Sequence, residues 1–512
     1  MAVKTFAAID VGSYEISMKI YEISRTGLGE MDHLRHGMDM GTEVYKTGKL
    51  GPEHIEELCR ILCEFKACMD TYRVESYAAY ATSAIREAQN AMILLDRISV
   101  RSGLKIGILS NSEQRLLHYK AIALKEEDFY SAIQKSTAIV DIGGGSIQIS
   151  LFEKDSLVST QNLRLGVLRL ADQIHGLDLV PSKHEALLSE IIDAQMAIYK
   201  KQFMRGKQVD NVIIIDDYLS DIFVRGHFCQ EGGYSNRELL EELLYNISAS
   251  FRQELGRRLG IPEDKIILLQ ISAVLLQRFM VMVDAARLWV PGTTLCDGIA
   301  FEYAEKKRII RPSHDFEQDI IACAMGISQR YRGSRRRGET LVQICLAIYD
   351  SMKKIHGLGR RERLLLRLAA LLSDCGHFIS MATVADSSYN IIIATEIIGL
   401  SHLERVIVAN VVKFSHQDFA CFEHSECGQG IDRASYLTIA KLVAILRIAQ
   451  GLEAGHGRQF NSAGAQLKED EMILTVDTDK DVALEMGHFA DSFDFFAEVF
   501  SIRVKVRRKR GS

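Results

Sequence analysis

Two segments of the chain share one pattern of apolar and polar positions. Residues 5–21 form an apolar stretch, a turn that contains Asp10 and Gly12, and then a stretch in which apolar and polar positions alternate. Residues 136–151 repeat this order, with Asp141 followed closely by a glycine triplet. An apolar strand, a tight glycine turn and an alternating strand together predict a β-hairpin. Because the pattern recurs after about 130 residues, it predicts two related α/β lobes.

Helical and strand-like patterns alternate between the two hairpins. Apolar positions spaced three and four residues apart predict helices, and short apolar runs predict strands. The predicted helices cover 52–72 and 84–101, and the predicted strands cover 76–80 and 105–109. Such alternation is typical of α/β folds with some parallel strand pairing. We expect lobe I to cover residues 1–130 and lobe II to cover residues 131–310.

The pattern changes near residue 315. From there apolar residues recur at helical spacing, and the predicted helices cover 339–354, 361–372, 389–398, 403–412 and 436–452. We therefore expect an all-α domain over residues 315–456. The end of the chain returns to mixed structure, with a strand over 472–476, a helix over 489–500 and a strand over 501–506. We expect a small α+β domain with a basic tail over 457–512.

Charge adds one asymmetry to this organisation. The 512 residues include 62 basic and 67 acidic side chains, and this balance of −5 gives no whole-chain signature of nucleic-acid binding. We accordingly expect no nucleic-acid partner. Residues 500–512 nevertheless carry six basic side chains and no acidic one, and residues 330–337 are rich in arginine. Both segments could guide a long polyanion or could be solvated charge runs, and the alternation over 502–507 predicts a strand with one basic face.

Targeting and redox features indicate a cytoplasmic protein. No apolar stretch long enough for a signal peptide precedes Asp10, and no run of about 18 apolar residues predicts a membrane span. The ten cysteines include no C-x-x-C pair, as expected for free thiols in a reducing compartment. We expect no membrane partner.

The glycine triplet is the strongest candidate for chemistry. Residues 143–145 leave backbone N–H groups that can converge on an anion, and glycine tolerates the positive φ that such turns need. Ser146 adds a hydroxyl, and Asp141 could hold a metal ion or a water molecule. A glycine-rich hairpin can also be only a tight turn. The similar turn at Asp10 and Ser13 favours a phosphate cleft, because two facing turns would line it with amides.

A third segment, residues 81–90, follows a predicted strand. Thr82 or Ser83 can cap the helix that begins there, and Arg86 lies in its first turn. An arginine beside exposed helix N–H groups suits phosphate binding. The alternative is an arginine paired with an acid on a solvated helix.

Together these motifs resemble the exopolyphosphatase/guanosine pentaphosphate phosphohydrolase (Ppx/GppA) family. The similarity includes the opening D-x-G-S, the T-S-A-x-R-E-A-x-N segment, D-I-G-G-G-S and the following G-V-L-R-L. It continues through the helical segment around His377, which is similar to the family's HD-type domain. The resemblance implies an α/β fold of two actin-like (ribonuclease-H-like) lobes that flank a phosphate cleft, followed by an all-α HD-like domain and a small α+β C-terminal domain.

The resemblance also implies roles for individual residues. In the family an E-E-A-R-L segment carries the catalytic base, and pairing its R-L step with residues 115–116 places Glu113 there. Asp141 and Gln148 join Glu113 as catalytic residues, and Asp10 and Asp141 become ligands of an implied Mg²⁺ ion. The expected phosphate-binding residues are Gly12, Ser13, Ser83, Arg86, Gly143, Gly144, Gly145 and Ser146. Without the resemblance, Glu113 would be interpreted as a surface residue at a helix start.

The chain departs from the family's pattern around the expected cleft. Tyr14 stands where the family has Asn, Gln148 where it has Glu, and Cys296 where it has Arg. A Gln offers a metal only a neutral oxygen. The family's third, glycine-rich phosphate loop is replaced by a segment that contains Asp216 and Asp217, which would repel a polyanion.

Two functions are compatible with these residues. The favoured one is a Ppx/GppA-type hydrolase that releases terminal phosphate from inorganic polyphosphate or guanosine pentaphosphate. The alternative is a catalytically weak or silent sensor that binds polyphosphate or guanosine penta- or tetraphosphate and signals through its helical domain. That domain keeps Asp374 and His377 but lacks the other ligands of metal-dependent HD enzymes, so we expect it to be structural. A sugar-kinase-like enzyme is disfavoured by the helical domain, and a homodimer is compatible with the sequence.

Overall fold

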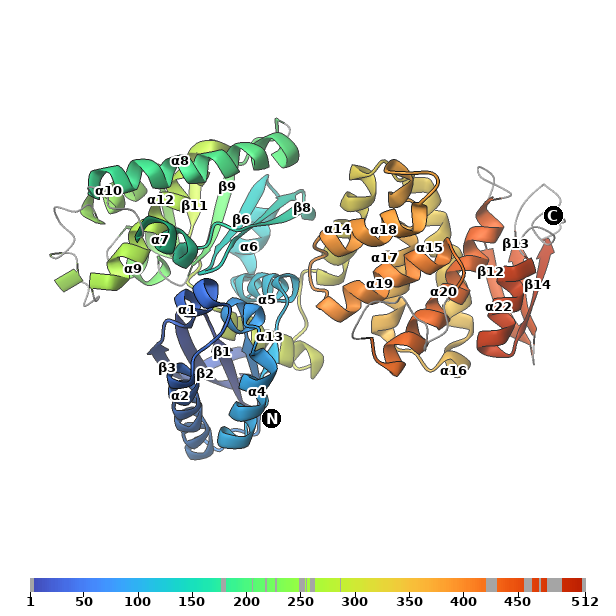
Figure 1. Cartoon of the computed structure of the whole chain (residues 1–512), viewed down its shortest axis with the longest axis horizontal. Helices are drawn as coiled ribbons and strands as arrows, with labels where there is room; N and C mark the ends of the chain where they lie inside the picture. Colours follow the sequence, from blue (N-terminus) through green and yellow to red (C-terminus); the bar gives the residue numbers. More distant parts are fainter. Residues whose placement is uncertain are drawn as a thin grey trace. The chain divides into compact units, whose positions relative to one another are not determined.

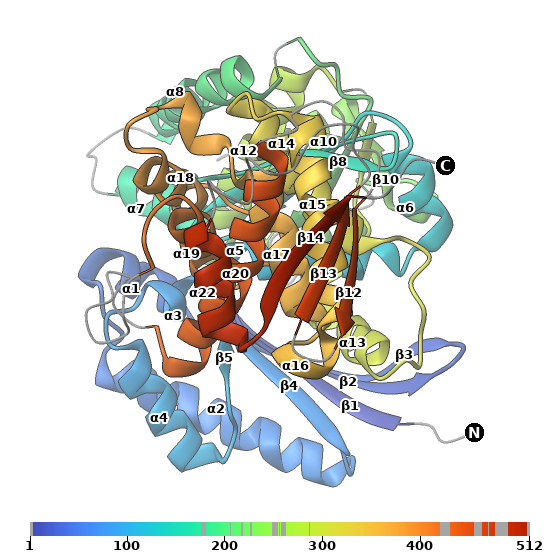
Figure 2. The ribbon, with the colours of Figure 1, turned by 90° about the vertical axis from the view of Figure 1, so that its right-hand side faces the viewer.

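The computed structural model describes residues 4–175, 181–204, 206–216, 219–225, 228–247, 254, 256–257, 263–285, 287–419, 431–454, 463–468, 471–476 and 490–508. The chain forms two compact units, Met1–Asp319 and Ile320–Ser512. Figures 1 and 2 show its elements from two directions.

The first unit opens with a five-stranded mixed sheet in the order β3-β2-β1-β4-β5 (Figure 1). Its strands are β1 (Lys4–Val11), β2 (Glu15–Ser24), β3 (Gly27–Gly37), β4 (Ser76–Ala81) and β5 (Gly107–Ile108). The first three strands pair antiparallel, whereas β4 pairs with β1, and β5 with β4, in parallel. The predicted hairpin and the predicted parallel pairing are therefore confirmed.

A second sheet in the same unit has the strand order β10-β11-β9-β6-β7-β8. Its strands are β6 (Thr137–Ile142), β7 (Ile147–Glu153), β8 (Ser156–Leu163), β9 (Asn211–Asp216), β10 (Tyr234–Asn236) and β11 (Arg287–Trp289). Strands β6 to β8 form an antiparallel meander, and β9 and β11 add to it in parallel. This is the arrangement of the first sheet with one additional edge strand, β10.

The two hairpins also share their register. Asp10 lies opposite Ser17 in the first hairpin, and Asp141 lies opposite Gln148 in the second. Each turn is closed by the same backbone bond, from Gly12 N to Glu15 O and from Gly143 N to Ser146 O, both at 3.0 Å. The repeated pattern in the sequence thus corresponds to a repeated backbone geometry.

Helices cover both faces of the first sheet. The helices of this part are α1 (Met40–Thr47), α2 (Pro52–Thr71), α3 (Ser83–Glu87), α4 (Ala91–Ser102), α5 (Asn111–Ala123) and α6 (Glu126–Ile133). Alternate residues of β1 face opposite sides: Ala7 and Ile9 share a core with α2 and α4, while Phe6 and Ala8 share one with α13 (Leu295–Lys306). A strand buried on both faces explains the continuous apolar run in its sequence.

The single helix predicted over 84–101 is wrong, because the chain forms two helices there. Ala88 adopts an extended conformation, with φ −69° and ψ 125°, and this ends α3. The interruption places the Asn90 side chain against Leu50, whose N–H and C=O it binds at 3.1 and 2.9 Å. Side-chain bonding to a distant backbone therefore outweighs the helical pattern.

Further helices complete the first unit around the second sheet. They are α7 (Val167–His175), α8 (Pro181–Tyr199), α9 (Ser220–Arg225), α10 (Arg237–Ile247) and α12 (Glu263–Val283), with a π-helical turn at Lys200–Met204 and a 3-10 turn at Glu231–Gly233. Helix α12 and helix α20 (Arg433–Ala454) are long and apolar enough to span a membrane. In each, 67% of the apolar window is buried inside the protein, which is the behaviour of a core helix.

The second unit consists mainly of helices and ends in a small sheet. Its helices include α14 (Phe316–Arg330), α15 (Arg335–Ser351), α16 (Lys353–His356), α17 (Arg360–Leu372), α18 (Val384–Ala394), α19 (His402–Ser415), α20 and α22 (Ala490–Phe500), with a 3-10 turn at Cys375–Phe378. The sheet has the order β12-β13-β14, formed by Ala463–Lys468, Glu471–Val476 and Arg503–Arg508 (Figure 2). Exposed Arg503, Lys505 and Arg507 alternate with less exposed residues along β14, so the predicted one-sided basic strand is confirmed.

The arginine-rich segment 330–337 is tied into the protein. Arg337 forms an ion pair with Asp374 and another with Glu453, the latter at 2.6 Å. Asp374 thus joins the end of α17 to α15, and the structural role of the domain stays a prediction. Arg335 pairs with Glu339 at 2.8 Å. These bonds engage two of the guanidinium groups that an extended polyanion track would need, whereas Lys509 and Arg510 of the tail lie outside the described residues.

The crossing of α5 and α13 was not predicted from the sequence. A Cβ built on Gly298 would lie 2.0 Å from the Leu117 carbonyl oxygen, so the two helix backbones approach too closely for any side chain. Leu117 also joins Leu295 and Cys296 in the core beneath the first sheet. Helix α5 is therefore held by backbone contact as well as by side chains.

We expect Gly298→Ala to lower the free energy of unfolding by about 3 kcal/mol, at the upper end for an overpacked core. Gly29→Ala is the matched control, because its Cβ would meet Glu22 O at an ordinary 3.6 Å. Urea unfolding followed by circular dichroism measures both variants. Equal stability of the two would contradict the importance of this crossing.

His314, in the segment after α13, is held between two carboxylates. Its Nε2 lies 2.7 Å from Asp319 Oδ2, and its Nδ1 lies 3.2 Å from Asp155 Oδ1. Burial opposes protonation of the ring, but the Asp319, Asp155 and Asp315 carboxylates outweigh it and raise the pKa of His314. Burial also raises the pKa of Asp319. The folded cluster therefore binds protons more tightly than the unfolded chain does.

Because its pKa is raised in the folded state, protonated His314 contributes its full share to the free energy of unfolding below about pH 6.5. This contribution is lost as the pH rises through the folded-state pKa. We expect His314→Gln to lower the free energy of unfolding by about 1 kcal/mol at pH 6 and by less at pH 9. Urea unfolding at pH 6, 7.5 and 9 gives the comparison. A cost that stays constant over this range would mean that His314 acts by packing alone.

Candidate functional site

The two glycine turns face each other within the first unit. A Cβ built on Gly144 would lie 3.2 Å from the Ser13 Cβ, so the tips of the two hairpins are in contact. Each tip is fixed by a backbone bond, from Gly41 N to Ser13 O at 2.8 Å and from Leu168 N to Gly144 O at 3.0 Å. The structure therefore brings the two predicted turns together at one place.

Three hydroxyl groups meet between the turns. Ser13 Oγ lies 2.6 Å from Ser83 Oγ and 2.9 Å from Tyr45 Oη, and Tyr45 Oη donates to Ser83 Oγ at 2.8 Å. A Cβ built on Gly145 would lie 2.7 Å from the same Tyr45 oxygen. Burial raises the pKa of Tyr45, while the two serines act in the opposite direction. A neutral phenol thus occupies the contact between two predicted phosphate ligands, Ser13 and Ser83.

Arg169 on α7 connects the same groups from the other side. Its Nε donates to Gly145 O at 2.9 Å, and its guanidinium lies 4.3 Å from the centre of the Tyr45 ring. It also pairs with Glu87 on α3. Tyr45 and Arg169 were not among the predicted site residues. Arg169 lies in the G-V-L-R-L segment that resembles the family, so the sequence could have indicated it. Nothing in the sequence singled out Tyr45.

Arg86 has structural partners in this arrangement. Its Nη1 donates to Leu109 O at 2.7 Å and its Nη2 donates to Asn111 Oδ1, at the start of α5. The side chain therefore joins α3 to α5. Its predicted phosphate-binding role stays a prediction and would require a ligand to compete with these two acceptors.

Glu113 lies in the first turn of α5, where it forms a capping box with Ser110. Ser110 N donates to Glu113 Oε2 at 2.9 Å, and Glu113 N donates to Ser110 Oγ at 3.1 Å. The sequence S-x-x-E is the usual signature of this motif. Glu113 is partly buried. The carboxylate that was predicted as the general base therefore has a structural function at the helix start.

Asp141 and Gln148 are contacted by two side chains from the middle of α5. His118 Nδ1 lies 2.8 Å from Asp141 Oδ2, and Arg115 Nε donates to Gln148 Oε1 at 2.7 Å. Arg115 also donates to Thr160 Oγ1 on β8. All of these side chains are buried, Arg115 with 1% of its surface exposed. Sequence reasoning missed Arg115 and His118 as partners of the second hairpin.

The implied Mg²⁺ ion does not fit these groups as they lie. Asp141 and Gln148 direct an oxygen toward His118 and Arg115, whose nitrogens would repel a cation wherever they carry protons. Gln148 would moreover supply a neutral ligand. In the described part of the chain, no three His, Cys, Asp or Glu side chains are grouped so that they could hold a metal.

Two departures from the family's pattern are explained by burial. Asp216 lies at the end of β9, accepts from Leu219 N at 2.5 Å and binds Ser272, with 4% of its surface exposed. The Asp216 side chain therefore bonds within its own lobe, and its predicted repulsion of a polyanion stays a prediction. Asp217 lies outside the described residues. Cys296 is fully buried 3.5 Å from Ser17 Oγ, and burial together with the charge of Asp10 raises the pKa of its thiol.

We expect Tyr45→Phe to bind inorganic triphosphate roughly threefold to tenfold more tightly, because the loss of one hydroxyl releases Ser13 and Ser83 for phosphate. Tyr303→Phe is the control, since it removes a similar bond to Ser76, of 2.6 Å, elsewhere in the unit. Isothermal titration calorimetry measures both. Weaker binding by Tyr45→Phe would mean that the phenol helps to hold the phosphate.

Comparison with known proteins agrees with the fold and with the motifs. The profile of the Ppx/GppA phosphatase family matches residues 19–212, and that of Ppx/GppA phosphatase domain III matches residues 322–488. Exopolyphosphatase 1 of Mycobacterium tuberculosis is 24% identical over 190 residues, which are 37% of this chain and 54% of that protein. The chain thus spans about half the length of this relative.

Two further similarities cover a larger share of the matched protein. A guanosine-5'-triphosphate,3'-diphosphate pyrophosphatase of Photobacterium profundum is 17% identical over 492 residues, which are 92% of this chain and 91% of that protein. The crystal structure of an exopolyphosphatase from Cytophaga hutchinsonii matches with a TM-score of 0.52 and 18% identity, over 60% of this chain and 100% of that one. At this identity the structural match concerns the fold alone.

Proposed function

Because the chain belongs to the Ppx/GppA phosphatase family, we propose that it hydrolyses the terminal phosphoanhydride bond of inorganic polyphosphate or guanosine pentaphosphate. The observation that carries this proposal is the contact between the two glycine turns, at Ser13 and Gly144. Two facing hairpin tips with glycine amides and serine hydroxyls offer the kind of groups that bind a polyanionic phosphate.

In this proposal each group has a defined task. The amides of Gly144 and Gly145 and the hydroxyls of Ser13 and Ser83 bind the terminal phosphate once Tyr45 withdraws. Glu113 takes the proton from the attacking water, and its bond to Ser110 N fixes the direction of the carboxylate. No step is assigned to Mg²⁺, because the side chains around Asp141 do not fit it as they lie.

The test is phosphate release from polyphosphate and from guanosine pentaphosphate, each with Mg²⁺ and with a chelator. We expect Glu113→Gln to lower kcat by about 10² to 10⁴. Gln can replace Glu in a capping box, so the unfolding free energy should change little. Glu113→Ala serves as the comparison, because it loses both the base and the cap. A full rate in Glu113→Gln would remove Glu113 from the mechanism.

A second candidate is a protein that binds the same phosphate ligands without hydrolysing them. The observation in its favour is that α5 engages Asp141 and Gln148 through His118 and Arg115. Calorimetric binding of inorganic triphosphate, together with no phosphate release with or without Mg²⁺, would favour this function over hydrolysis. For either function we propose a cytoplasmic location. We also propose that the protein is a homodimer, and light scattering can test its oligomeric state.

A further inference from the structure

A cavity lies in the first unit away from the glycine turns, and we propose that it binds a phosphorylated organic molecule of nucleotide size. The pocket has a volume of about 680 Å³, within the range of small-molecule sites. It is formed by β2, the β2–β3 turn, the start of β3, the end of α5 with the residues after it, α13 with the residues before it, and residues 309–314. The proposal does not depend on the hydrolase function.

The pocket is separate from the contact between the glycine turns. Strand β2 begins at Glu15, next to the first turn, and ends at Ser24, next to pocket residues Arg25 and Thr26. Lys19 is the pocket residue of β2 nearest to the turn, and it lies four residue steps, or about 13 Å along the strand, from Glu15. No residue of the two glycine turns lines the pocket.

The rim of the pocket carries three exposed cations, Arg25, Lys125 and Arg311. Elsewhere in this unit most arginines near the candidate site bind a carboxylate or a carbonyl. The charged side-chain groups of these three residues have no ion-pair or hydrogen-bond partner within the described part of the chain. They come from three segments that are distant in the sequence and that line one cavity. Such convergence of unpaired positive charge favours an anionic ligand, and phosphate is well matched by arginine.

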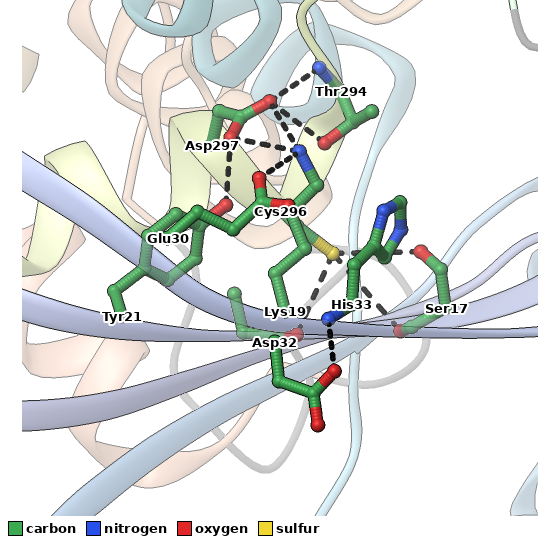
Figure 3. A network of polar contacts seen from close by, with 10 residues as sticks. Ser17, Lys19, Tyr21, Glu30, Asp32, His33, Thr294, Cys296 and Asp297 are labelled. Carbon is green, nitrogen blue, oxygen red and sulfur yellow. Dashed lines mark hydrogen bonds and ion pairs between the residues drawn. The ribbon is translucent and has the colours of Figure 1, made fainter.

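A polar network lines part of the pocket and is called its floor here; it consists of Lys19, Tyr21, Glu30 and Asp297, whose contacts are drawn in Figure 3. Lys19 Nζ lies 3.1 Å from Asp297 Oδ1 and 3.0 Å from Glu30 Oε2, and Tyr21 donates to Asp297 at 2.7 Å. Burial opposes the charge on Lys19, but Asp297 and Glu30 outweigh it and raise the pKa of Lys19. Burial likewise opposes the charge on Asp297, but chiefly Lys19 outweighs it and lowers the pKa of Asp297.

This network decides which part of a ligand the floor can contact. Asp297 is saturated by Lys19, Tyr21 and the Thr294 cap, whereas Glu30 keeps 46% of its side chain exposed. Glu30 can therefore accept a hydrogen bond from a ligand. A purely anionic ligand such as polyphosphate would meet repulsion from Glu30, whereas a molecule with N–H or O–H donors would not.

Apolar side chains complete the wall of the pocket. Phe301, Leu28, Ile309 and Ile310 line it together with the polar groups. The Thr293 hydroxyl, also in the lining, is buried and has no hydrogen-bond partner in the structure. An aromatic ring, aliphatic contacts, hydrogen-bonding groups and a cationic rim match a nucleotide, whose base is flat and apolar-faced and whose phosphates are charged.

The test measures binding of ATP, GTP and inorganic triphosphate to the full chain by calorimetry at constant ionic strength. The variant removes two rim cations, Arg25→Ala with Lys125→Ala. The matched control, Arg287→Ala with Lys135→Ala, removes the same charge from two exposed positions outside the pocket. We expect the rim variant to weaken binding of at least one nucleotide roughly tenfold or more, and the control to change it less than about twofold.

The remaining outcomes decide against the proposal. Equal loss in the rim and control variants would show that net charge, not the pocket, attracts the nucleotide. Absence of nucleotide binding up to millimolar concentration would also overturn it. If inorganic triphosphate lost affinity by the same factor as the nucleotides, the rim would bind anions without an organic group. Glu30→Gln tests whether the floor contacts the organic part of the ligand. It should alter the preference between ATP and GTP while leaving triphosphate binding unchanged or tighter.

Discussion

The close crossing of α5 and α13 is the constraint on which the first unit depends. Because Gly298 has no side chain, the α13 backbone lies against Leu117 and holds α5 in one position. The beginning of α5 then carries Glu113 next to the capping serine, its middle contacts the second hairpin, and its end borders the pocket. One helix therefore links the candidate cleft, the second sheet and the proposed second site.

Charge around Asp141 and Gln148 is arranged differently from what a metal ion bound to these two residues would need. The buried Arg115 guanidinium meets neutral oxygens of Gln148 and Thr160, and His118 meets the Asp141 carboxylate. A glutamate at position 148 would form a buried ion pair here, with a much larger desolvation cost. The change from a carboxylate to an amide is thus compatible with a protein cation at this place and less compatible with a bound divalent ion.

The sequence predicted the hairpins and most helices, because local periodicity and turn chemistry determine these features. The meeting of the two turns was predicted from the repetition of the turn motif. It failed where distant segments decide the outcome. The break at Ala88 depends on Leu50, and the contacts of Arg115 and His118 depend on how α5 lies on the second sheet. Asp216 had the expected position at a strand end, but its direction into the lobe follows from Leu219 and Ser272. The pocket rim unites three segments that no local pattern connects.

The attachments of α5 also determine how the first unit can deform. Arg86 fastens the start of the helix at Asn111, on the side of the first sheet, while Arg115 fastens it to the second sheet. Only four residues, or about 6 Å of helix, separate these anchors. A rotation of one sheet against the other must therefore be absorbed as torsion within a single helical turn. Such a short torsional element is stiff. A large rotation of the two sheets away from each other would therefore first have to break the contacts of Arg86 or those of Arg115.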